Sequence, residues 1–175
     1  MSYQADEATS EHVGRRVVLR TNAQFDALAG AFEQAVPELS DEAALAELRA
    51  GDWAGFVRGV QWESPSGFVR TATSHPAALL AHAGADARSV VWHLAHHAIT
   101  ARLFRHDPGT MLHLPLRVEA HTTRTPGTVL SFEVPSTVLA GYGVNKITQA
   151  GAELDRALGD LLEDIGLPRP SALRR

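Results

Sequence analysis

The segment 111–121 (MLHLPLRVEAH) alternates apolar and polar residues and constrains the fold more than any other part of the chain. Successive side chains of a strand point to opposite faces of a sheet, so this alternation predicts a strand with one buried and one solvated face. A second alternating segment, 128–134 (TVLSFEV), follows a short polar turn, and the two predict a hairpin. The apolar face of the first strand is formed by Leu112, Leu114, Leu116, Val118 and Ala120.

Pro115 lies inside that predicted strand. Because proline has no backbone N–H to donate to a neighbouring strand, we expect either an edge strand or a local distortion at this position.

Three further segments have the apolar, β-branched composition of strands: 15–20 (RRVVLR), 67–73 (GFVRTAT) and 89–96 (SVVWHLAH). Helices are predicted before 37, over 40–50 and over 98–106. The clearest helix runs over 144–165, where apolar residues recur at helical spacing until Gly166 and Pro168 end the pattern. We interpret 52–67 as an irregular connection or a short broken helix, and 135–145 as a loop.

Interleaved strands and helices favour a single α+β domain, with a mixed or antiparallel sheet and helices packed against it. We expect this domain to span 14–167, with a flexible N-terminal tail at 1–13 and a C-terminal tail at 168–175.

Composition excludes several classes of protein. The chain of 175 residues has no cysteine, which excludes disulfides, zinc-thiolate sites and thiol nucleophiles, and its net charge of −4 argues against a general nucleic-acid binder. It has no apolar run near the ~20 residues of a membrane span and no signal-peptide pattern, so we expect a soluble cytoplasmic protein that binds neither nucleic acid nor membrane.

Histidines gather in the middle of the chain, and His96 and His97 occupy the predicted junction between a strand and a helix. Free amides of a first helical turn favour anions and lower the pKa of a nearby imidazole, which suits a general base. We therefore predict His96 and His97 as catalytic residues. The alternative is that one ring packs in the core with its nitrogens satisfied.

The polar face of the segment 111–121 supplies a second candidate. If a helix or a partner covers this face, His113 and Arg117 would form the wall of a pocket for an anionic group, with Arg117 paired to Glu119 or another carboxylate. If the face is solvated, it is the ordinary outer side of a sheet. His93, Arg102 and Tyr142 complete the predicted ligand-binding residues.

Metal and haem binding remain alternatives with weak support. His93 and His97 share a strand face but would lie ~13 Å apart, too far to chelate one ion. One axial histidine beside an apolar pocket would suffice for haem, with Arg102, Arg105 or Arg117 for a propionate. We therefore predict no metal site and leave the cofactor open. Trp53 and Trp62, beside Phe56 and Phe68, are interpreted as core rather than as a ligand cage.

Three stretches carry a family resemblance: VVWHLAHHAITARLFRHDPGTMLHLPLRVEA, TVLSFEVPST and ELDRALGDLL. Between Val90 and Leu162 the chain resembles the domain of unknown function 302 family, in a form seen in actinobacterial chains. The family pattern has Gly-Asn-Pro at the turn where this chain has His96-His97-Ala98. The resemblance implies a compact α+β fold, often dimeric, and leaves the chemistry open.

These observations lead to one preferred function and two alternatives. We expect a small-molecule-binding protein or enzyme with a histidine- and arginine-lined pocket, acting by general acid/base catalysis, and assembled as a homodimer. The alternatives are a noncatalytic accessory or interaction module, and a haem or metal protein.

Overall fold

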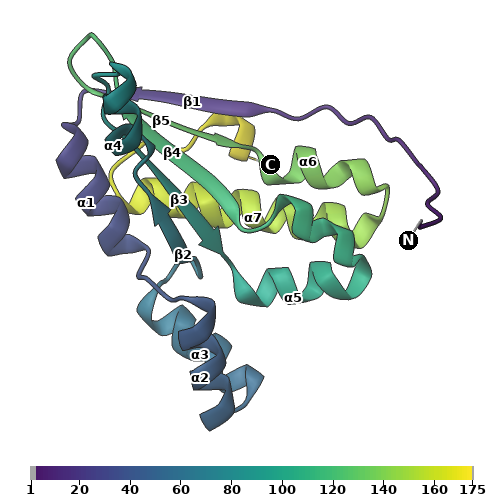
Figure 1. Cartoon of the computed structure of the whole chain (residues 1–175). Coiled ribbons are helices and arrows are strands. Elements are labelled where there is room, and N and C mark those ends of the chain that lie inside the picture. Colours follow the sequence, from purple (N-terminus) through teal and green to yellow (C-terminus); the bar gives the residue numbers. More distant parts are fainter. Residues whose placement is uncertain (1–2, 175) are drawn as a thin grey trace.

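The computed structural model describes residues 3–174, and within them one antiparallel sheet has the strand order β1-β5-β4-β3-β2 (Figure 1). Helices pack against this sheet, which confirms the predicted α+β fold. The strands are β1 (Arg16–Thr21), β2 (Val69–Ser74), β3 (Ser89–Ala95), β4 (Leu116–Thr122) and β5 (Thr128–Glu133). The helices are α1 (Phe25–Ala35), α2 (Asp41–Ala50), α3 (Trp53–Glu63), α4 (Pro76–Leu80), α5 (His97–His106), α6 (Pro135–Leu139) and α7 (Asn145–Asp164).

One face of the sheet carries the main core. Alternate residues of β4 are buried, most residues of β3 are buried, and α7 crosses behind both strands in Figure 1. Phe32 of α1 stacks on Trp92 of β3 with ring centroids 4.2 Å apart, and Leu154 and Leu158 of α7 complete the layer. Burying large side chains of this kind contributes ~1.5–3 kcal/mol each. The buried residues of the strands and the apolar stripe of α7 therefore pack in one core, as the spacing of apolar residues in the sequence predicts.

The opposite face of the sheet is polar along β4 and apolar at one end. Arg117 and Glu119 project from β4 between the buried residues. At the far end, Phe56 and Val60 of α3 form a second, smaller core with strand residues of β2 and β3. The helices α2 and α3 thus cover one end of this face, where Figure 1 shows them projecting below the sheet.

β4 begins later than the alternation predicts. Pro108–His113 forms a 3₁₀ turn, and Leu112 is 83% exposed, so the predicted apolar face starts at Leu114 and Leu116 instead. Pro115 directly precedes the strand because it cannot donate to the ladder. The prediction of an edge strand is wrong, since β4 lies between β3 and β5.

The segment interpreted as an irregular connection or a short broken helix forms the regular helix α3 over Trp53–Glu63. The side chain of Asp52 caps it by accepting a hydrogen bond from the Gly55 N–H at 2.6 Å, which satisfies one of the free amides of the first turn. Trp53 is 45% exposed and Trp62 is 89% exposed. The interpretation of these two tryptophans as core residues is therefore wrong.

The segment predicted as a loop after β5 is partly helical. The short helix α6 has no side-chain cap from Val134 before it. Instead Asp155 of α7, which is buried, accepts a hydrogen bond from the Ser136 N–H at 3.0 Å. A carboxyl group from a distant helix thus fixes the start of α6.

The segment expected to be a C-terminal tail contacts the domain. Its residue Leu173 is fully buried in the main core.

Among residues 3–174, no helix combines the length and apolar character that crossing a membrane requires.

Candidate functional site

The sheet opens between β4 and β5 at one end. Their pairing begins at Val118 and Phe132, and Leu116 has no opposite residue on β5 because β5 ends at Glu133 and α6 begins at Pro135. A cavity of about 530 Å³ occupies this opening. We call it the strand-gap cavity.

Apolar side chains, all but Leu112 buried, form one wall of the strand-gap cavity. They come from the turn before β4, from the two strands, and from α6 and α7: Leu112, Leu116, Val118, Phe132, Val138, Leu139 and Leu158. Because α6 supplies part of this wall, the hydrogen bond between Asp155 and Ser136 also holds the cavity in shape.

Polar side chains form the opposite wall, and they include two arginines and two glutamates, of which Glu133 lies opposite Arg16 in the register of β1 and β5. Arg16 of β1 and Arg117 of β4 both line the cavity and are exposed. Neither forms an ion pair with another residue in the described range, unlike Arg88, Arg102 and Arg169. Arg117 is exposed, as expected for a solvated face, and the pairing with Glu119 that was expected for a covered face is not found. Neither guanidinium group is therefore held by a carboxylate in the described range.

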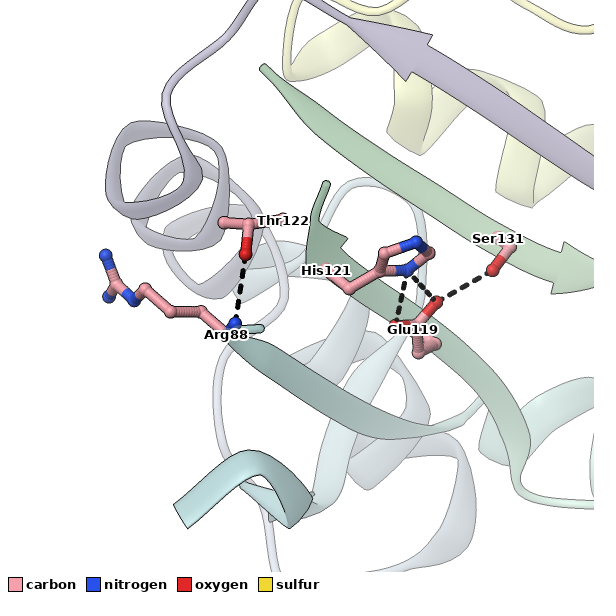
Figure 2. A network of polar contacts seen from close by, with 5 residues as sticks. All are labelled: Arg88, Glu119, His121, Thr122 and Ser131. Carbon is pink, nitrogen blue, oxygen red and sulfur yellow. Dashed lines mark hydrogen bonds and ion pairs between the residues drawn. The ribbon is translucent and has the colours of Figure 1, made fainter. Parts of the chain in front are cut away.

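Glu119 is engaged by two neighbours instead of Arg117. His121 donates from Nδ1 to both carboxylate oxygens, at 2.8 and 3.0 Å, and the Ser131 hydroxyl donates to Oε2 at 2.8 Å (Figure 2). Figure 2 shows His121 of the same strand and Ser131 of β5 both directed at Glu119, and a separate hydrogen bond from the Arg88 N–H to the Thr122 hydroxyl. These contacts occupy the Glu119 carboxylate, which is therefore held by His121 and Ser131 rather than by Arg117.

His113 lies at the mouth of the cavity among other rings. His12 and Tyr142 each contact it edge-on, with ring centroids 5.9 Å apart in both pairs. Burial lowers the pKa of His113, His12 lowers it further, and Glu133 opposes the change. The Tyr142 hydroxyl donates to the Gly109 carbonyl at 2.6 Å, so its proton is already used.

His96 and His97 lie where β3 meets α5, as predicted, and pack against aromatic rings. Phe68 is edge-on to His96 with centroids 5.4 Å apart, and Phe56 is edge-on to His97 at 5.2 Å. His96 Nδ1 and His97 Nε2 are buried without a hydrogen-bond partner among the described residues. The rings therefore pack as core residues do, yet each keeps a nitrogen that the protein does not satisfy.

The environment of both histidines disfavours protonation. Burial lowers the pKa of His96, Arg102 and His97 lower it further, and Glu153 opposes the change. Burial also lowers the pKa of His97, against the effect of Asp41.

The structure does not place the predicted residues in one pocket. His96 and His97 line a cavity of about 60 Å³ that does not include Arg117. His93 lies opposite Arg117 in the register of β3 and β4. Arg102 is already engaged, because it forms a bidentate ion pair with Glu153. His113 and Arg117 therefore line the strand-gap cavity, whereas His96 and His97 do not.

Among residues 3–174, no group of three or more histidine, aspartate or glutamate side chains is arranged to hold a metal ion. The two adjacent histidines thus have no third ligand of that kind nearby.

Sequence reasoning did not identify Arg16 as a site residue. Its strand was predicted, but the pairing of β1 with β5, which places Arg16 opposite Glu133, is a long-range contact without a local signal. Asp155 was also missed, although a charged residue between Leu154 and Leu158 on an apolar stripe was a visible signal.

We expect acid to destabilise the protein through His96 and His97. Their pKa is lowered in the folded state, so stability is fully present above the ordinary histidine value near 6.5 and falls as the pH drops, because the unfolded chain binds protons that the folded chain does not. Urea titrations between pH 7.5 and 4.5 should show this slope, reduced in His96→Gln. His82→Gln removes an exposed imidazole and should keep the slope. Equal slopes in wild type and His96→Gln would contradict the assignment.

Comparison with known proteins shows a likeness to a solved structure and none to a family model or a curated protein. No family model matches the chain, and no curated protein matches it either. The crystal structure of an uncharacterized conserved DUF302 protein from Bacillus stearothermophilus is similar, with a TM-score of 0.63 and 10% sequence identity over 86% of this chain and 97% of that one. At this level of identity the likeness establishes that the two proteins share the DUF302 fold.

Proposed function

We propose that this protein binds a medium-chain aliphatic carboxylate in the strand-gap cavity. The single observation that carries the proposal is the pairing of an apolar wall with two arginines that have no ion-pair partner in the described range. The aliphatic chain would lie against side chains such as Leu116 and Val138, and the carboxylate would lie between Arg16 and Arg117.

The size and composition of the cavity support a small ligand. A volume of about 530 Å³ falls within the ~300–1,000 Å³ typical of small-molecule sites. Apolar walls with a few polar groups at one side are the usual composition of such sites, because the walls supply affinity and the polar groups fix orientation. Aliphatic side chains dominate this wall, which favours an aliphatic over an aromatic ligand.

Binding is favoured over catalysis in this cavity. The Glu119 carboxylate is held by His121 and Ser131, and the predicted catalytic pair His96 and His97 does not line the strand-gap cavity. General acid/base catalysis by that pair stays a prediction. Membership in the actinobacterial form of the family, a homodimer and a cytoplasmic location stay predictions as well.

Calorimetric titration with decanoate tests the proposal. We expect saturable binding of one decanoate per chain and loss of binding in Val138→Trp, because the larger ring fills the cavity. Val18→Trp makes the same substitution at an exposed valine on β1 outside the cavity and should bind as wild type does.

A second variant covers the case in which Val138→Trp does not fold. Leu112 is exposed at the rim, so Leu112→Glu should fold and should weaken decanoate severalfold by placing a negative charge at the mouth. Equal binding to wild type and both cavity variants would refute the proposed function.

A further inference from the structure

A second cavity, of about 400 Å³, lies between the helices α5 and α7. The two helices pack side by side (Figure 1). Residues three or four apart share one face of a helix, so each helix presents a stripe of residues to this space. We call it the helix-pair cavity. Its polar lining residues differ from those of the strand-gap cavity and are Arg102, Arg105, His106, Lys146, Gln149 and Glu153.

An ion pair joins the two helices within this lining. Arg102 of α5 donates from both terminal nitrogens to the Glu153 carboxylate of α7, with Nη1 3.2 Å from Oε1. The Arg102 guanidinium lowers the pKa of Glu153, against the opposing effect of partial burial, so this carboxylate is ionised near neutral pH. The negative charge of Glu153 is therefore already matched by Arg102.

The other cationic groups of the cavity have no carboxylate partner. Arg105, His106 and Lys146 are exposed, and none of them forms an ion pair within residues 3–174. Arg105 Nε donates to the Ala101 carbonyl at 3.3 Å, which leaves its two terminal nitrogens to solvent or a ligand. The lining thus has an excess of positive charge, although the whole chain has a net charge of −4.

The sequence of α7 leaves this positive charge unbalanced. Gln149 lies one turn before Glu153 on the same face and also lines the cavity. A glutamate at this position would supply a second carboxylate, whereas glutamine supplies a neutral amide that donates hydrogen bonds. Helix stability does not explain Lys146, because it lies in the first turn of α7, where the helix dipole disfavours a cation. An anion in the cavity would balance these charges.

The composition of the lining indicates which anion fits. Guanidinium, ammonium, imidazole and amide groups all donate hydrogen bonds, and Ala150 is the one apolar residue among those that line the cavity. Several charged donors around one space suit the three oxygens of a phosphate group better than the two of a carboxylate. Without an apolar wall, the helix-pair cavity does not suit the aliphatic chain proposed for the strand-gap cavity.

We propose that the helix-pair cavity binds the phosphate group of a small polar molecule. Arg105 and Lys146 pair with the phosphate oxygens from the two helices, and Gln149 donates from its side-chain amide. The ion pair between Arg102 and Glu153 keeps α5 and α7 together beside this site. The site is separate from the strand-gap cavity and takes a different class of ligand.

Calorimetric titration of the full chain with glycerol 3-phosphate tests the proposal. At pH 7.5 and low ionic strength the phosphate group carries nearly two negative charges. We expect saturable binding that is about tenfold weaker in Arg105→Gln and in Lys146→Gln, because each removes one solvent-exposed charged donor. Both side chains are exposed, so the variants should fold.

Gln149→Glu is the sharpest test, because it keeps the size of the side chain. Its carboxylate would repel the phosphate and pair with Arg105 or Lys146, so binding should fall by at least about tenfold. Gln34→Glu makes the same substitution at an exposed position of α1 outside the cavity, and it should bind as wild type does.

Inorganic phosphate distinguishes the two sources of the phosphate group. Tighter binding of glycerol 3-phosphate than of inorganic phosphate would identify an organic phosphate as the ligand. Equal or tighter binding of inorganic phosphate would identify the free ion. Either result supports the helix-pair cavity as a phosphate site, provided that Gln149→Glu abolishes it.

Failure of this proposal is distinguishable from failure of the proposed function. The double variant Arg16→Gln with Arg117→Gln should keep glycerol 3-phosphate binding, because neither arginine lines the helix-pair cavity. Absence of saturable binding to the wild-type chain, equal losses in Gln149→Glu and Gln34→Glu, or loss of binding in the double arginine variant would overturn the phosphate site. None of these outcomes depends on whether decanoate binds.

Discussion

Replacing Asp155 by alanine is expected to lower the free energy of unfolding by about 3 kcal/mol and to weaken decanoate binding at the same time. The variant leaves the buried Ser136 N–H without its acceptor and removes the only side-chain cap that the described residues give to α6. Because α6 contributes Val138 and Leu139 to the strand-gap cavity, loosening this helix should also disturb the apolar wall.

Urea denaturation checks the first part, with two matched variants. Asp155→Asn keeps an oxygen acceptor at the same position and should lose less stability than Asp155→Ala. Asp164→Ala removes an exposed carboxylate near the end of the same helix and should change stability by less than ~0.5 kcal/mol. Similar losses in Asp155→Ala and Asp164→Ala would show that the buried hydrogen bond does not stabilise α6.

Replacing both Arg16 and Arg117 by glutamine is expected to weaken decanoate about 100-fold. Hydrogen bonds to a charged group contribute ~1.5–3 kcal/mol, and exposure to solvent reduces this value, so we expect about tenfold for each arginine. Calorimetry at low ionic strength measures the loss, and added salt should reduce the affinity of the wild type more than that of the double variant.

Two controls test whether the loss of decanoate affinity is specific to the arginines of the cavity. The double variant Arg20→Gln with Arg124→Gln removes two exposed arginines that do not line the cavity, and its affinity should equal that of the wild type. Decanol has no charge, so the double cavity variant should bind it as the wild type does. Equal weakening by both double variants would mean that net charge, rather than the cavity, attracts decanoate.

Much of the fold was accessible from sequence periodicity. The hairpin, β3 and α7 follow from alternation and helical spacing, because each buries one regular face in the core. The start of β4 was misplaced because Leu112 extends the alternation into a turn where it meets solvent. Alternation of apolar and polar residues does not show where along the segment the chain begins to pair as a strand.

The helices α3 and α6 were missed for different physical reasons. In α3, exposed Trp53 and Trp62 obscure the stripe formed by Phe56 and Val60, so the period was not recognised. In α6, five residues are too few for a period, and its cap comes from a residue far along the chain. Tertiary contacts rather than local pattern determine such elements.

The candidate site was predictable in part. His113 and Arg117 were selected from the polar face of one strand, and both line the strand-gap cavity. Their partner Arg16 could not be found, because its position depends on pairing between the first and last strands of the chain. His96 and His97 were located correctly at the junction of β3 and α5, but a strand end does not indicate which cavity its residues line.

Amide chemical shifts recorded during a decanoate titration test the central claim most directly. We expect the largest shifts to fall on the strand-gap cavity, at Arg117, Glu119, Ser131 and Val138, while Trp53 and Phe104, which do not line this cavity, change little. Shifts centred outside the strand-gap cavity, or no saturable shifts at the opening between β4 and β5, would contradict the proposed function.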